Sequence, residues 1–92
     1  MRVRFHIDAD TGLPHCETHG IRPEEVLDIL RGPSDQGPGK NDTRIAEGQT
    51  RHGRYLRVIY TYGDDGSIFV ITAYDLTGNA KAAYRRRRRR RP

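Results

Sequence analysis

The sequence has few of the features that stabilise a small protein or anchor it in a membrane. It contains one cysteine, Cys16, and no tryptophan, and only 34% of its 92 residues are hydrophobic. A single cysteine excludes an intramolecular disulfide. Proteins of the reducing cytosol usually have none. No stretch approaches the roughly 18 apolar residues of a membrane span, and the first residues lack the apolar segment of a signal peptide. We therefore expect a cytoplasmic domain with a small core and no membrane partner.

The excess of positive charge comes from one short segment at the end of the chain. There are 17 Lys and Arg residues against 12 Asp and Glu residues, and removing the seven consecutive arginines of 85–91 leaves 17 − 7 = 10 against 12. We therefore predict one slightly acidic domain over residues 1–84 and a polyarginine tail over residues 85–92. Such a tail attracts phosphates or acidic proteins, although long blocks of like charge are also found as solvated ends without a dedicated partner.

Hydrophobic periodicity and turn residues predict the elements of the first half. Apolar residues alternate with polar ones over residues 3–7, which is typical of a strand with one buried face. Residues 13–19 are compatible with a short helix, and a second helix is predicted from Pro23 to Arg31, with proline at its first position and Gly32-Pro33 after it. The following segment, 34–41, is rich in glycine, proline and polar residues, so we predict a loop there.

The second half reads as three strands and a final helix. The strand candidates cover residues 43–50, 54–62 and 67–74, and short polar turns separate them, so they are expected to form an antiparallel meander. Thr77 is placed to cap a helix that continues into the arginines. Together these elements predict an α+β fold, with an antiparallel sheet made of the meander and the N-terminal strand, and with helices packed on one face.

Strand alternation leaves a candidate binding surface on the other face of this sheet. It assigns Tyr55, Arg57, Thr72 and Tyr74 to the open face. Such a face can hold a phosphate and stack a base of single-stranded RNA, while the plainer interpretation is a set of ordinary cross-strand pairs. The side chains assigned to the core face are Leu56, Val58, Tyr60 and Tyr62 on one strand and Phe69, Ile71 and Ala73 on the next.

The histidines offer little evidence for a metal. His15 and His19 are four residues apart with Cys16 between them, a separation that a metal ion can use on a helix. No second pair follows, and the glutamate of the paired-histidine zinc motif is absent. We therefore predict no metal and no cofactor, and interpret His19 as a capping or packing residue.

Five short segments, taken in order, resemble the BrnT-like family of small bacterial toxins and its uncharacterised relatives. They are His19-Gly20-Ile21, Pro23-Glu24-Glu25-Val26, Gly53-Arg54-Tyr55-Leu56, Ile71-Thr72-Ala73 and Ala83-Tyr84. The family looks like a reduced RelE fold. The resemblance implies a type II toxin–antitoxin system, in which the toxin cuts RNA until a cognate antitoxin binds it. The chain departs from the family at Tyr74-Asp75-Leu76, where toxin members carry basic residues.

Metal-independent RNA cleavage needs a cation for the phosphorane charge and groups that move two protons. Arg54 and Arg57 are the candidate cations, and Tyr74 and His52 are the candidates for proton transfer. The candidates for RNA binding are Tyr55, Thr72, Arg85, Arg86, Arg87 and Arg88.

Two alternatives to a ribonuclease follow from the same residues. A non-catalytic nucleic-acid-binding domain of this fold is favoured by the departure at Tyr74-Asp75. The other alternative is a protein-interaction module, or a homodimer, whose tail engages an acidic partner. A polycation speeds association with acidic surfaces.

Overall fold

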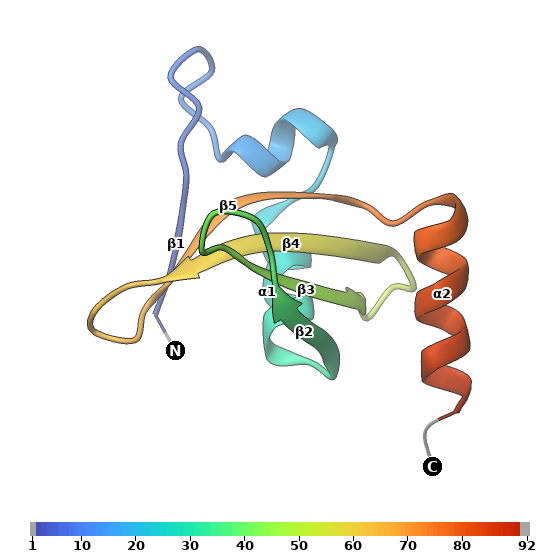
Figure 1. Ribbon diagram of the computed structural model, residues 1–92. Helices are drawn as coiled ribbons and strands as arrows, with labels where there is room; N and C mark the ends of the chain where they lie inside the picture. Colours follow the sequence, from blue (N-terminus) through green and yellow to red (C-terminus); the bar gives the residue numbers. More distant parts are fainter. Residues whose placement is uncertain (1, 91–92) are drawn as a thin grey trace.

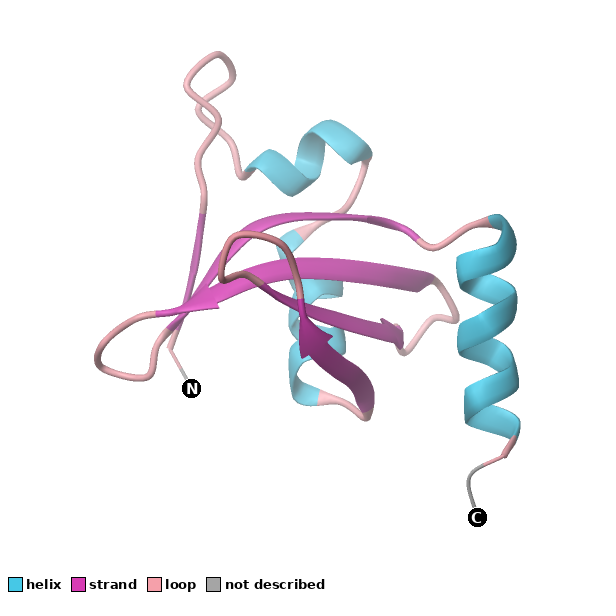
Figure 2. Cartoon of the chain, viewed as in Figure 1, coloured by secondary structure: helices cyan, strands magenta, loops and turns pink. Residues whose placement is uncertain are grey.

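The computed structural model describes residues 2–90, which form an α+β arrangement of five strands, two α-helices and one 3₁₀ helix (Figures 1 and 2). Arg91 and Pro92, which belong to the predicted tail, lie outside the described residues. The elements are β1 (Val3–Phe5), η1 (His15–His19), α1 (Pro23–Arg31), β2 (Ser34–Pro38), β3 (Arg44–Gln49), β4 (Tyr55–Tyr62), β5 (Ile68–Asp75) and α2 (Gly78–Arg89).

The five strands form one mixed sheet in the order β1-β5-β4-β3-β2. The predicted meander is confirmed, since β3, β4 and β5 pair antiparallel to one another. The prediction of a purely antiparallel sheet is wrong, because β1 runs parallel to β5. β1 and its partner β5 are not consecutive in the chain, and η1, α1 and three strands separate them, so no tight turn forces an antiparallel pair.

The predicted loop over 34–41 is also wrong in part, because Ser34–Pro38 forms the edge strand β2. It pairs antiparallel with β3, from Ser34 opposite Gly48 to Pro38 opposite Arg44. Proline is tolerated on an edge strand, where one side of the backbone has no ladder partner. The pairing depends on the neighbouring strand more than on the polar sequence of β2, which explains why its composition reads as a loop.

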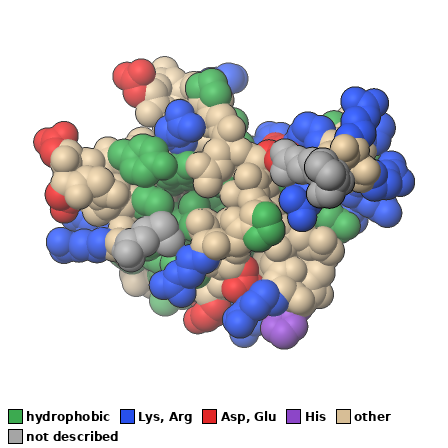
Figure 3. Space-filling model, turned by 90° about the horizontal axis from the view of Figure 1, so that it is seen from below, with side chains coloured by type: hydrophobic (Ala, Val, Ile, Leu, Met, Phe, Trp, Pro, Cys, Tyr) green, Lys and Arg blue, Asp and Glu red, His purple; other side chains and the backbone are tan. Residues whose placement is uncertain are grey.

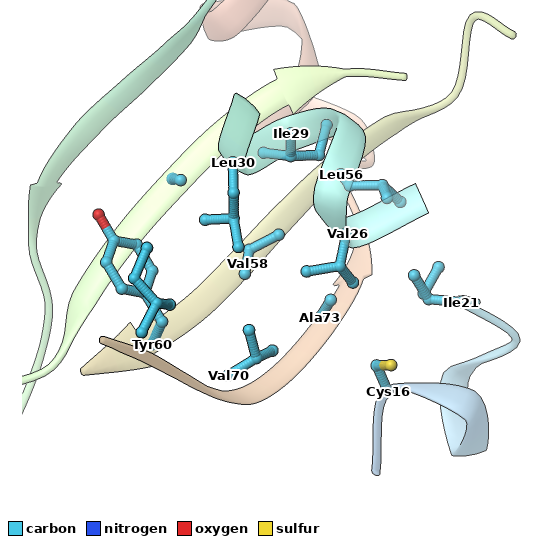
Figure 4. Packing of buried hydrophobic residues seen from close by; sticks show 12 residues of the cluster. Cys16, Ile21, Val26, Ile29, Leu30, Leu56, Val58, Tyr60, Val70 and Ala73 are labelled. Atoms are coloured by element: carbon cyan, nitrogen blue, oxygen red, sulfur yellow. The ribbon is translucent and has the colours of Figure 1, made fainter. Parts of the chain in front are cut away.

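The core lies between α1 and one face of the sheet (Figure 4). The predicted bounds of α1 are confirmed, and its Val26, Ile29 and Leu30 are buried at i, i+3 and i+4 spacing. Leu56, Val58 and Tyr60 of β4 are buried, as strand alternation predicts, but Tyr62, which it also assigns to the core, is 55% exposed at the end of the strand. Cys16 of η1 joins the same cluster, and burial raises the pKa of its thiol.

A β-bulge interrupts the pairing of β4 with β5. Ile59 lies opposite Thr72, but the next residue, Tyr60, lies opposite Val70, so Ile71 is the extra residue on β5. One extra residue in a strand reverses the face of every side chain beyond it.

The bulge therefore corrects the predicted faces of β5. Ala73 is buried in the core as predicted, but in the first half of the strand Ile68 and Val70 are the buried residues. Phe69 and Ile71, which alternation from Ala73 assigns to the core, are only half-buried and alternate with them. In the first half of β5 the face opposite α1 therefore carries Phe69 and Ile71, where alternation predicts Ile68 and Val70.

The final helix, α2, forms as predicted and stands at one end of the sheet (Figure 1). Thr77 occupies its N-cap position, although no side-chain hydrogen bond caps the helix. Tyr84 is 2% exposed and its ring lies 5.9 Å from that of Tyr55, on the face opposite α1. The prediction that the helices share one face is therefore corrected, because α1 and α2 contact opposite faces. Within residues 2–90, no helix has the length and apolar character needed to cross a membrane.

Candidate functional site

A row of four polar side chains crosses the sheet on the face opposite α1, called here the open face. Asp35 of β2 pairs with Glu47 of β3, Glu47 with Arg57 of β4, and Arg57 with Tyr74 of β5. Directly opposed residues of neighbouring strands have side chains close enough to interact. The register therefore brings together Arg57 and Tyr74, two of the residues predicted for the site.

Arg57 is a fixed cation in this row. Its Nη1 donates to the Tyr74 hydroxyl at 3.4 Å and its Nε donates to Glu47 Oε2 at 2.6 Å. The guanidinium carbon also lies 5.8 Å from the centroid of the Tyr74 ring. The hydrogen bonds to Tyr74 and Glu47 raise the pKa of Arg57, so the guanidinium keeps its charge at every physiological pH.

Beside Arg57 and Tyr74 the open face is hollowed into a groove of about 480 Å³. The bulge is part of its origin, since it places the side chain of Ile71 on this face. Asn41 and Asp42, with φ of 56° and 63°, make the tight turn that borders the groove. The other lining residues are Ile45 and Ile59, which are apolar, and Lys40 and Thr43, which are polar.

Arg87 of α2 closes the other end of the polar row. Its Nε donates to Asp35 Oδ2 at 2.8 Å and its Nη2 donates to Glu47 Oε1 at 2.8 Å. The hydrogen bond to Asp35, together with the charge of Glu47, raises the pKa of Arg87. Glu47, only 12% exposed, is thus held between Arg57 and Arg87. This predicted RNA-binding arginine docks the helix onto the sheet.

The neighbouring arginines of α2 remain at the surface. Figure 3 shows Lys and Arg side chains gathered over this helix. Arg85 and Arg88, both predicted to bind RNA, line a smaller cavity of about 230 Å³ with Arg89, Gln49 and Tyr55. Arg86 is exposed on the same helix. Three arginines around one cavity can hold a phosphate by charge and by hydrogen bonds.

Arg54, the other predicted cation, lies apart from Arg57. Its Nε and Nη2 donate to the two oxygens of Asp75 at 2.7 and 3.0 Å, and its Nη1 donates to Gly20 O at 3.0 Å and to Glu25 Oε1 at 3.2 Å. These bonds, that to Asp75 first, raise the pKa of Arg54. Arg54 therefore connects η1, α1 and β5. Asp75, at the position where the sequence departs from the family it resembles, is the carboxylate partner of Arg54.

The remaining predicted residues divide between the groove side and the surface. Thr72 is half-buried one position along β5 from the bulge, and its Oγ1 is buried without a hydrogen-bond partner among the described residues. Tyr55 packs on Tyr84, with Lys81 Nζ 4.9 Å from its ring. His52 lies in the exposed turn between β3 and β4, and the structure joins it to neither Arg57 nor Tyr74.

Sequence reasoning missed a row of histidines that leads to Tyr74. Ring centroids are separated by 5.9 Å between His6 and His15, by 5.6 Å between His15 and His19, and by 6.3 Å between His19 and Tyr74. The helical spacing of His15 and His19 is visible in the sequence, but the approach of η1 to β5 is not. Among residues 2–90, no three His, Cys, Asp or Glu side chains are placed to hold a metal ion.

Comparison with known proteins adds no relative: no protein-family model, no curated protein and no solved structure matches the chain.

Proposed function

We propose that this protein is a metal-independent ribonuclease, the toxin of a type II toxin–antitoxin system with a RelE-like fold, and that RNA binds on the open face. The observation that carries the proposal is the groove of about 480 Å³, which is lined by three isoleucines and by the Arg57–Tyr74 pair. Unpaired RNA bases stack on apolar and aromatic surfaces, while their phosphates need cations. Both kinds of contact are adjacent here.

Arg57 supplies the charge that RNA cleavage requires. Attack of the 2′-hydroxyl on the phosphate builds negative charge on the phosphorane oxygens, and a cation held in place stabilises that charge without having to reorganise. Glu47 and Tyr74 hold the guanidinium of Arg57, whose side chain is 28% exposed. A phosphate can reach the exposed part of the guanidinium while Glu47 keeps its orientation.

The arginines of α2 increase the affinity for RNA in this proposal. Arg85, Arg88 and Arg89 surround a cavity at the end of the sheet, next to Tyr55, which offers an aromatic ring. Each phosphate neutralised by such a cation releases counterions, so binding weakens steeply as salt rises. A cognate antitoxin that covers the open face would block the groove and its border at once.

A non-catalytic nucleic-acid-binding domain is the second candidate function. It is favoured by Arg54, because the guanidinium is already bonded to Asp75, Glu25 and Gly20 and is not offered to a substrate. In that case the arginines of α2 supply the binding and the open face supplies no chemistry.

Inducible expression in bacterial cells, with growth and total RNA followed together, tests the proposal. Intact protein should arrest growth and degrade RNA, and a variant carrying Arg57→Gln and Tyr74→Phe should do neither. Arg51→Gln is the matched control, because Arg51 is 82% exposed and pairs with Asp28. Normal growth with intact RNA would contradict the ribonuclease, and salt-dependent RNA binding by that inert protein would support the second candidate.

A further inference from the structure

The row of histidines reaches the same side of the sheet as the groove. The ring of His6, which follows β1, lies 6.3 Å from the ring of Phe69, one of the side chains that the bulge moves away from the core. His19, at the end of η1, contacts Tyr74 edge-on. Three imidazoles therefore form a row along β5, and His19, at one end of the row, is next to Tyr74.

Asp8 orients one of these imidazoles. Its Oδ2 lies 3.3 Å from His15 Nδ1, while its Oδ1 accepts from the backbone N–H of Asp10 at 2.9 Å. The hydrogen bonds from Asp10 and His15 lower the pKa of Asp8, so the carboxylate is charged. A carboxylate on Nδ1 favours the tautomer with the proton on that nitrogen. This leaves a lone pair on Nε2 and stabilises the imidazolium that forms when Nε2 takes a proton.

We propose that His15 and His19 are the proton-transfer residues of the ribonuclease. This inference rests on the proposed function and replaces the proton-transfer roles predicted for Tyr74 and His52. Histidine is suited to both directions of transfer, because its ordinary pKa of about 6.5 lies near neutral pH. The ring centroids of His15 and His19 are 5.6 Å apart. Since a hydrogen bond spans about 2.8 Å, both rings can reach oxygens bonded to one phosphorus atom.

These two residues account for both proton transfers of RNA cleavage. Neutral His15, oriented by Asp8, accepts the proton of the 2′-hydroxyl as the 2′-oxygen forms its bond to phosphorus. The bond from phosphorus to the 5′-oxygen breaks, and His19, as imidazolium, gives that oxygen a proton. The products are a 2′,3′-cyclic phosphate and a 5′-hydroxyl. The phosphorane that forms on the way needs a cation, for which Arg57 is the candidate.

The groups that face the two rings come from several elements. His6 lies just after β1 and Asp8 in the loop that follows, Tyr74 belongs to β5, and Arg57 of β4 stands behind Tyr74. Cleavage needs one imidazole neutral, to accept a proton, and the other protonated, to donate one. The rate of cleavage should therefore rise and fall with pH as a bell whose limbs belong to this coupled pair.

Purified protein and a fluorescent RNA oligonucleotide test the assignment over pH 5–9. His15→Asn and His19→Gln should each lower kcat by about 10²–10⁴-fold and remove one limb of the pH profile, with RNA affinity changed by less than about threefold. Asp8→Asn, a change in a positioning residue, should lower kcat less and shift the limb of His15. The matched control is His52→Gln, an exposed histidine away from Tyr74, which should leave rate and profile unchanged.

A second measurement does not depend on the folding of any variant. A 2′-deoxy oligonucleotide binds without being cleaved, and in the native protein it should shift the imidazole NMR signals of His15 and His19 and leave those of His52 in place. If the intact protein cleaves RNA but the His15 and His19 variants keep its rate and pH profile, the inference is overturned and the ribonuclease stands. No cleavage by the intact protein overturns both.

Discussion

Replacing Arg54 by alanine tests whether this residue stabilises the fold. The bidentate pair with Asp75, which is 44% exposed, contributes about 0.5 kcal/mol, as exposed ion pairs do. Glu25 is 15% exposed, and losing its charged hydrogen bond and that to the Gly20 carbonyl costs about 1.5 kcal/mol more. The sum is about 2 kcal/mol, which lowers the Tm of a domain of this size by about 8–16 °C.

Thermal and urea unfolding followed by circular dichroism measure this loss. Arg51→Ala is the matched control: Arg51 also pairs with a carboxylate of α1, Asp28, but its side chain is 82% exposed, so less than about 0.5 kcal/mol should be lost. Arg54→Lys should recover only part of the stability, because an ammonium group cannot bond Asp75 and Glu25 with a planar fork. If Arg54→Ala unfolds at the temperature of Arg51→Ala, the structural role of Arg54 is refuted.

Three further predictions concern the charged side chains. Arg54 lowers the pKa of Asp75, so this pair stabilises the fold fully above the unfolded-state pKa of about 3.9 and is lost as pH falls through the lower folded value; the stability deficit of Asp75→Asn should therefore shrink below about pH 4 in unfolding experiments. Arg87→Ala should speed amide hydrogen exchange in α2 by about threefold or more, while Arg85→Ala should not. Equal exchange rates in the two variants would contradict the docking contact of Arg87. Glu47→Gln removes the negative charge between two arginines and should tighten RNA binding several-fold at low salt in anisotropy titrations, an effect that should vanish at high salt.

The helix α1 shows what local sequence can predict. Its proline at the first position, its apolar stripe and the glycine after it specify start, face and end without reference to the rest of the chain. The strands of the meander are equally visible, because β-branched and aromatic residues fill them. In both cases the information lies within about ten residues.

Other features depend on residues far apart in the sequence. The polar segment Ser34–Pro38 becomes a strand because β3 offers it a free edge, and β1 takes its direction from β5. The bulge at Ile71 arises in the pairing of β4 with β5, and no residue type in β5 predicts it. The same limit applies to the site: Arg57 and Tyr74 follow from alternation, whereas the groove and the approach of His19 to Tyr74 require the assembled sheet.

The contact of Arg87 has a consequence for how this terminus tolerates change in length. Arg87 is the third residue after Tyr84, whose buried ring fixes the rotation of α2. Because residues 85–91 are all arginine, inserting or deleting one codon within the run leaves an arginine at that third position. Runs of different length therefore keep the contact of Arg87 and differ in how many arginines follow it. Repeat expansion or contraction would adjust the attraction for polyanions gradually, without a change in the fold.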